Sequence, residues 1–299
     1  MKKLLLLLAL LAFSATSSFA QIKITDNLTV TGFFDMSSTY DTATKSNSLS
    51  FDQFEVDFIY NYGHGLSAQA DINSLSGGSV DLEQAFVTYK APNGVSITGG
   101  KFLSCSGWET AEPTGLYQYS YSATLVYGGY QNGAAVGFGN GKVGFFGSVV
   151  SSVWDGTDTS FDDLGFEAQV AFTPVEAFTA KVAYLWEDMG GFEQSLVNAW
   201  GMYATGPVTL AAEYNYLANW GESGNSGYGW ILMGNMALSD KVGATVRYSG
   251  LDTDADGKFT EITFSPSYAI TDNWGVLAEL RRDIDSEVTL FAFESIFTF

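Results

Sequence analysis

The chain has 299 residues, and its 33 acidic side chains against 13 lysines and arginines give a formal net charge of −20. This charge excludes a nucleic-acid partner, because phosphate backbones are bound by clustered Lys and Arg. One Cys and one His exclude a disulfide framework and a zinc site made from those residues. Abundant glycine and 15% aromatic residues, with no long apolar run after residue 20, favour a β-barrel in lipid.

The N-terminus predicts a cleaved signal peptide. Lys2 and Lys3 precede a short apolar run that ends at Phe13, and Ser18-Phe19-Ala20 places small residues at the two cleavage positions. We therefore expect two parts, a signal peptide over 1–20 and an outer-membrane domain of a Gram-negative bacterium over 21–299.

Apolar and polar residues alternate along most of the remaining chain. The period of two is clear in residues 162–173, 178–187, 208–216 and 242–249. Side chains on a strand point alternately to its two faces, so each of these segments predicts a strand with one apolar and one polar face. The segments span about 10–13 residues, which is the length that a tilted strand needs to cross a bilayer.

Short and long connections also alternate along the chain. Tight turns with Gly, Asn, Asp or Pro are predicted at 63–65, 92–94, 139–141, Thr173-Pro174, 206–207, 239–240 and 271–273. Longer, mostly acidic connections are predicted at 41–48, 74–80, 104–119, 155–160, 187–193, 218–227, 252–258 and 284–287. The pattern predicts an all-β fold, a transmembrane antiparallel up-and-down β-barrel with both termini periplasmic.

About 16 strands are expected between Leu28 and Phe299, and the strand count stays open between 14 and 16. The phase of residues 81–103 is ambiguous, because Phe86 and Lys101 each stand on the wrong face for their neighbours. Pro266 falls inside a strand, where it predicts a bulge or a locally broken ladder.

The last segment carries a specific pattern. Phe291, Phe293, Phe297 and Phe299 alternate with smaller or polar residues, although Ser295 stands where an apolar residue is expected. The segment resembles the C-terminal signal that the outer-membrane insertion machinery reads. That machinery and outer-membrane lipid are therefore expected partners, and an oligomer is left open.

Charged residues at inward positions predict the character of the lumen. By phase, the pore-lining residues are Asp35, Glu55, Asp57, Asp71, Asp163, Glu167, Lys181, Glu187, Glu213, Arg247, Glu261, Glu279, Arg281 and Glu294. A barrel of about 16 strands is wide enough for water. Acids outnumber bases among these residues, so the wall predicts a lumen that attracts cations.

The longest connection, about residues 104–128, follows the fifth predicted strand. It carries Trp108, Glu109, Glu112 and Tyr117, and we expect it to fold inward and constrict the channel. An external cap or a pair of longer strands is the alternative. Deletion of residues 109–116 should then raise single-channel conductance, and unchanged conductance would contradict the constriction.

A partial calcium motif stands near the C-terminus. Asp252, Asp254 and Asp256 occupy positions 1, 3 and 5 of a calcium-binding loop, and Gly257 occupies position 6. Position 12 is Thr263, where that motif needs a bidentate Glu. The alternative to a calcium site is an exposed acidic hairpin tip. No other cofactor is expected.

Two pairs of short motifs resemble the OmpL-like β-barrel porins. Gly100-Lys101-Phe102 and Gly107-Trp108-Glu109 are similar to that family's G-K-F and G-[YW]-E stretches. Ser120-Tyr121-Ser122 and Val153-Trp154-Asp155-Gly156 stand where the family has Ser-Arg-Ser and a stretch similar to Asn-Gly-Trp-Asp, with Tyr121 in place of the usual Arg. The resemblance spans about residues 28–299 and implies an outer-membrane barrel with porin activity and without catalytic residues.

Together these patterns predict an outer-membrane porin, a passive channel for small hydrophilic solutes and ions with a preference for cations. The alternative is a non-conducting barrel that serves as a surface or envelope-anchoring scaffold. An enzyme is not expected, because His64, the sole histidine, lies in a predicted periplasmic turn away from any external Ser or Asp.

Overall fold

The computed structural model describes residues 21–76, 78–122 and 126–299. The predicted signal peptide, residues 1–20, lies outside the described residues. In the described part of the chain, no helix is both long enough and apolar enough to cross a bilayer. The elements are β1 (Ile22–Lys23), β2 (Leu28–Asp41), β3 (Asn47–Gly63), β4 (Leu66–Leu75), β5 (Val80–Lys90), β6 (Val95–Leu103), the 3-10 turn η1 (Pro113–Gly115), β7 (Tyr130–Gly139), β8 (Val143–Val150), β9 (Gly165–Val175), β10 (Phe178–Asp188), β11 (Glu193–Thr205), β12 (Val208–Ala218), β13 (Ser226–Ala237), β14 (Val242–Thr253), β15 (Gly257–Thr271), β16 (Trp274–Asp283) and β17 (Thr289–Thr298).

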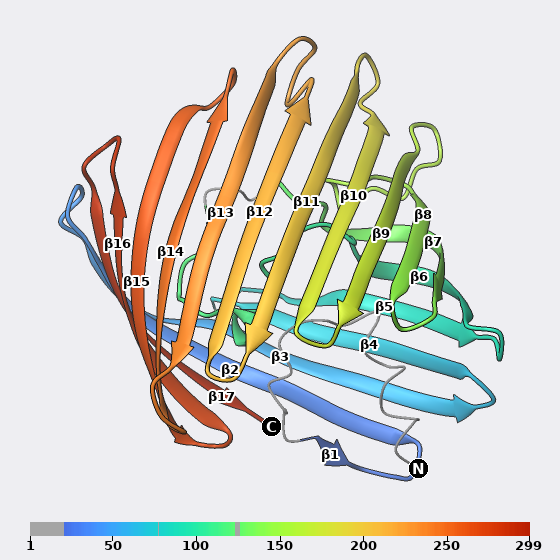
Figure 1. Ribbon diagram of the computed structural model, residues 1–299. Coiled ribbons are helices and arrows are strands. Elements are labelled where there is room, and N and C mark those ends of the chain that lie inside the picture. Colours follow the sequence, from blue (N-terminus) through green and yellow to red (C-terminus); the bar gives the residue numbers. More distant parts are fainter. Residues whose placement is uncertain (1–20, 77, 123–125) are drawn as a thin grey trace.

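Strands β2 to β17 form a closed antiparallel barrel in which each strand pairs with its neighbours in the sequence (Figure 1). The barrel closes because β17 also pairs with β2. Phe299 extends this seam: its N–H donates to the Gly32 carbonyl at 3.0 Å, and its carbonyl accepts the Gly32 N–H at 2.9 Å. The short β1 pairs with the start of β2. The predicted sixteen-stranded all-β barrel is confirmed, and fourteen strands are too few.

Side chains alternate between the lumen and the outside, as the period-two pattern predicts. On β9, Phe166, Val170 and Phe172 point outward and are between 43% and 48% exposed, whereas Glu167 faces the interior and is 3% exposed. Aromatic and aliphatic side chains occupy outward positions on the other strands in the same way. The outer surface therefore presents the apolar band that lipid requires, and the interior is polar.

One predicted turn is wrong. Thr173 and Pro174 lie within β9, and the chain reverses at residues 176–177 instead. The ladder between β9 and β10 shifts register at this point, because Val175 pairs with Phe178 while Phe172 pairs with Ala180. Proline is tolerated at such a bulge, since its nitrogen has no hydrogen to donate to the ladder. The other six turns join the strands where they were predicted.

A second bulge explains the ambiguous phase of residues 81–103. Asp71 pairs with Gln84 and Ile72 pairs with Leu82, so Glu83 is an extra residue on β5. The extra residue reverses the alternation, and Phe86 consequently packs against the buried apolar cluster inside the barrel.

Pro266 interrupts one ladder only. It pairs with Ala244 of β14, but the ladder between β15 and β16 passes from Phe264 directly to Ser267. The predicted local break therefore lies on the β16 side of the strand.

Candidate functional site

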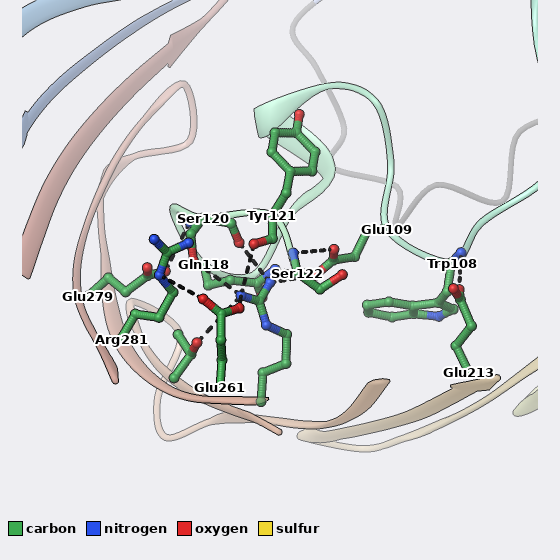
Figure 2. A network of polar contacts seen from close by, with 12 residues as sticks. Trp108, Glu109, Gln118, Ser120, Tyr121, Ser122, Glu213, Glu261, Glu279 and Arg281 are labelled. Carbon is green, nitrogen blue, oxygen red and sulfur yellow. Dashed lines mark hydrogen bonds and ion pairs between the residues drawn. The ribbon is translucent and has the colours of Figure 1, made fainter. Parts of the chain in front are cut away.

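The connection between β6 and β7, described at residues 104–122 and 126–129, folds into the barrel. Carboxylates of the wall accept two of its backbone N–H groups: Trp108 donates to Glu213 of β12 at 2.6 Å, and Ser120 donates to Glu279 of β16 at 3.0 Å (Figure 2). From the other side, Gln53 of β3 donates to Glu112 of the connection at 3.0 Å. Strands β3 and β12 stand nearly opposite each other in the strand order, so the connection crosses the lumen. We call residues 104–122 and 126–129 the inward loop.

Arg247 of β14 is the main anchor of the inward loop, and its side chain is 0% exposed. Its Nη1 donates to Glu109 Oε1 at 2.6 Å and to the Ser120 carbonyl at 2.7 Å, and its Nη2 donates to the Tyr121 carbonyl at 3.2 Å. The other oxygen of Glu109 accepts the Ser122 N–H at 2.8 Å. Hydrogen bonds to ionised groups are stronger than neutral ones, so this single guanidinium joins two separate stretches of the loop to the wall.

An apolar contact fixes the loop near its start. The rings of Trp108 and Tyr117 stack at 5.9 Å between centroids with an interplanar angle of 15°. Both pack against the buried side chains of Ile231 and Met233 on β13. This contact removes apolar surface from water and helps to fix the orientation of the loop against β13.

The four residues predicted for a constriction, Trp108, Glu109, Glu112 and Tyr117, therefore all lie inside the barrel. Glu112 accepts the Tyr130 hydroxyl at 2.6 Å in addition to the Gln53 amide. Burial, and then the nearby carboxylate of Glu83, raise the pKa of Glu112 to about 7.

Thirteen of the fourteen predicted pore-lining residues lie on strands with their side chains toward the interior. The acids are Asp35, Glu55, Asp57, Asp71, Glu167, Glu187, Glu213, Glu261, Glu279 and Glu294, and the bases are Lys181, Arg247 and Arg281. Most of these side chains are buried, because the inward loop and neighbouring wall residues cover them.

Asp163 is the exception, and its predicted place on a strand is wrong. It is exposed in the connection before β9, which begins only at Gly165. The Ser160 hydroxyl accepts the Asp162 N–H at 2.9 Å, which bends the chain into a local turn. The alternating segment predicted from residue 162 therefore begins only at Gly165.

Two interior acids escape the sequence pattern. Asp52 is the extra residue of a bulge between β2 and β3, where Asp35 pairs with Gln53 and Met36 pairs with Phe51. Glu83 is the extra residue of the β4–β5 bulge. A strict period of two does not assign an extra residue to either face, and the ambiguous phase of 81–103 was the one indication that a bulge was present.

Charge is distributed unevenly around the lumen. Among the described residues, the interior ion pairs all use Arg247 or Arg281, on β14 and β16, with Glu109 and Glu261 as partners. The part of the wall formed by β3 to β5 carries interior acids that form none of these pairs. They are Glu55, Asp57, Asp71 and Glu83.

A cavity of about 520 Å³ lies between the inward loop and the wall. Tyr119, Tyr121 and neighbouring residues of the loop line one side. The wall side is formed by β2 to β4 and β15 to β17, and its charged groups are Asp35, Asp52, Glu261, Arg281 and Glu294. This cavity is bounded by the inward loop on one side and by those strands on the other.

The predicted calcium residues lie at the β14–β15 hairpin. Asp254 accepts the Ser226 N–H at 2.8 Å, and Asp252 accepts the Tyr228 hydroxyl at 3.3 Å, so both carboxylates contact β13. Asp254 and Asp256 both lie in the three-residue turn, residues 254–256, that joins β14 to β15. Calcium binding by these three residues stays a prediction.

A closed antiparallel barrel with an apolar outer band and a loop folded into a polar interior is an outer-membrane barrel of the porin class. Residues 34–298 match the family described as "Putative beta-barrel porin-2, OmpL-like", and the chain belongs to this family. None of the curated proteins matches the chain by sequence.

Solved porin structures share this fold. OmpF of Salmonella typhi, solved as a complex with daunomycin, is 14% identical with a TM-score of 0.74, and the match covers 93% of this chain and 100% of that one. A loop-deletion mutant of the outer-membrane protein OmpT of Vibrio cholerae and an anion-selective porin from Comamonas acidovorans are each 12% identical with TM-scores of 0.70. Each of the two matches covers 91% of this chain and 99% of the other.

Proposed function

We propose that this porin is a passive diffusion channel for small hydrophilic solutes and ions, with a preference for cations. The observation that carries the proposal is the charge around the cavity beside the inward loop. Four carboxylates of the wall face it, those of Asp35, Asp52, Glu261 and Glu294, against the single guanidinium of Arg281. Fixed charge in a narrow, partly dehydrated passage attracts counter-ions and repels co-ions, so net negative charge favours cations.

Transport requires no reaction in this proposal. Selectivity comes from the width that the inward loop leaves and from the charge of the facing wall. The even strand number puts both termini at one end of the barrel, and we place that end in the periplasm with the longer connections outside.

Planar-bilayer recording across a potassium chloride gradient tests the proposal. We expect ohmic steps in conductance and a reversal potential whose sign shows potassium preference. The double variant Asp35→Asn/Glu294→Gln should reduce this potential, because it removes two carboxylates that face the cavity. Val170→Ala on the outer face is the matched control and should leave it unchanged. Anion preference would refute the charge argument, and absence of conductance would refute the channel.

A non-conducting scaffold is the second candidate. The observation in its favour is the extent to which the inward loop is bonded across the lumen, from β3 to β12. The deletion of residues 109–116 distinguishes the two functions. A channel should conduct before the deletion and gain conductance when the loop is shortened. A scaffold should show no conductance before the deletion.

We also propose that the C-terminal strand is the segment that the insertion machinery recognises. The support is the outward row of Phe291, Phe293 and Phe297, which are between 45% and 51% exposed on the seam strand. Phe297→Ala should lower the amount of folded protein in outer membranes while leaving refolding in detergent unchanged. An equal loss of folded protein in both assays would mean that Phe297 contributes to the stability of the barrel and not to recognition.

A further inference from the structure

Five carboxylates converge where the inward loop meets the wall of β3 to β5. Glu55 belongs to two triads: one with Asp57 and Asp71, the other with Glu83 and Glu112. Within each triad, one oxygen from every carboxylate lies within 4.8 Å of the oxygens of the other two. Three strands and the loop therefore bring their acids to a single place, which we call the acidic cluster.

A buried amide points into the acidic cluster and is left partly unsatisfied. Asn73 of β4 is 5% exposed and pairs directly with Glu55 across the ladder. Its Nδ2 donates to Glu83 at 2.7 Å, which fixes the amide head beside the carboxylates. Its Oδ1 has no hydrogen-bond partner among the described residues, and the same is true of buried oxygens of Asp57 and Glu83. Buried oxygens are rarely left in this state, so these three atoms have acceptor capacity for a further group.

Neutral donors reach the cluster, whereas none of the ion pairs of the described residues involves its five acids. Gln53 donates to both Glu55 and Glu112 at 3.0 Å, and Gln84 donates to Asp71 at 2.7 Å. Among the described residues, the interior guanidiniums of Arg247 and Arg281 form their ion pairs with Glu109 and Glu261, which do not belong to the cluster. Five adjacent carboxylates repel one another unless a cation or bound protons reduce their charge.

We propose that the acidic cluster binds a hard divalent cation of the calcium type. Carboxylates and an amide carbonyl are the oxygen ligands that such ions take, and the described ligand atoms include no imidazole or thiolate that would select a softer metal. Glu55 is the central ligand because it belongs to both triads. Glu112 comes from the inward loop, so the bound ion also fastens the loop to the β3–β5 wall. This site does not depend on the channel's ion preference.

Calcium titration of the intact folded protein in detergent tests the site. The protein is treated with a chelator, exchanged into chelator-free buffer near pH 8 and titrated calorimetrically with calcium chloride. We expect saturable binding that Glu55→Gln weakens by roughly 100-fold. Glu83→Gln, which tests the second triad, should weaken it as well. Heat-modifiable migration on gels shows that each variant still forms the closed barrel.

Two controls separate this site from other sources of calcium binding. Glu167→Gln removes an interior acid that is hydrogen-bonded by Ser148 at 2.8 Å outside the cluster, and Asp254→Ala disrupts the hairpin motif. Both should bind calcium in the cluster as the wild type does. Calcium should also protect the wild-type inward loop from chymotrypsin, and Glu112→Gln should reduce this protection.

Three results would overturn the proposal. The first is absence of saturable binding to the wild type, which would mean that protons alone reduce the charge of the cluster. The second is wild-type affinity in both Glu55→Gln and Glu83→Gln. The third is loss of all calcium binding in Asp254→Ala, which would place the ion at the β14–β15 hairpin.

Discussion

Replacing Arg247 with methionine tests what holds the inward loop in the lumen. The substitution keeps most of the side-chain volume but removes the guanidinium that pairs with Glu109 at 2.6 Å and donates to two loop carbonyls. Both partners of the pair are 0% exposed. Removing one member of a buried pair leaves the other charge uncompensated, at a cost of about 3–5 kcal/mol.

That cost falls on the docked loop more than on the wall, because the strand ladders do not use the Arg247 side chain. At 1.4 kcal/mol per factor of ten, it shifts the docking equilibrium by roughly 10²- to 10⁴-fold toward the released loop. We expect larger and noisier single-channel conductance, and faster chymotrypsin cleavage within residues 104–129. The double variant Glu109→Gln/Arg247→Met should recover part of the docking, since neither charge is then left alone.

Lys181→Met is the matched control for this experiment. It also removes one interior positive charge, but from β10, where Lys181 lies over the Trp200 ring at 5.1 Å. It should raise the preference for cations slightly and leave chymotrypsin cleavage of the loop unchanged. If Arg247→Met shows wild-type conductance and wild-type cleavage, the ion pair does not anchor the loop and the reasoning is wrong.

Three further changes test the seam, the outer face and the single thiol. Gly32→Val should lower stability by about 1–3 kcal/mol and reduce the yield of heat-resistant barrel, because a Cβ at Gly32 would lie 2.2 Å from the Glu55 carbonyl and 2.7 Å from the Phe299 ring. An unchanged yield would show that the seam can adjust. Val170→Arg should lower the free energy of unfolding, measured with urea in lipid vesicles, by about 2–4 kcal/mol, because it puts a charge into the apolar band. An unchanged free energy of unfolding would contradict the outward placement of Val170. Burial, and then the Glu167 carboxylate, raise the pKa of the Cys105 thiol above its ordinary value. Because the thiolate is the reactive form, iodoacetamide should react slowly near pH 8 and faster as the pH rises, and rapid reaction near pH 8 would contradict the burial.

The barrel could be predicted from the sequence because its physical requirement is simple. A strand between lipid and water must alternate, and β9 to β14 do so over most of their lengths. Six of the seven short connections were predicted correctly from their turn residues, because the conformational preference of a turn residue is also local. The turn at Pro174 could not be predicted correctly because proline is compatible with both a turn and a bulge, and only the pairing of β9 with β10 distinguishes them.

The candidate site was predictable only in part. The phase placed Glu55 and Asp71 in the interior, but Asp52 and Glu83 were missed because each is an extra residue at a bulge. The contact between Glu109 and Arg247 joins residues 138 positions apart. No periodicity encodes such a contact, since it depends on how the loop folds across the finished barrel.

The seam between β2 and β17 has a consequence for the order of assembly. The Thr31 hydroxyl and the Phe299 carbonyl that it reaches are 268 positions apart, so closure joins the first strand of the barrel, β2, to the residue that follows its last strand, β17. Contacts of such high sequence separation form late, because the entropy of ordering the intervening chain must be overcome first. Until Phe299 has been synthesised and reaches Gly32, the growing sheet has two open edges with unpaired backbone groups. Such edges pair readily with other chains, so we expect this polypeptide to need protection from that pairing until the barrel closes.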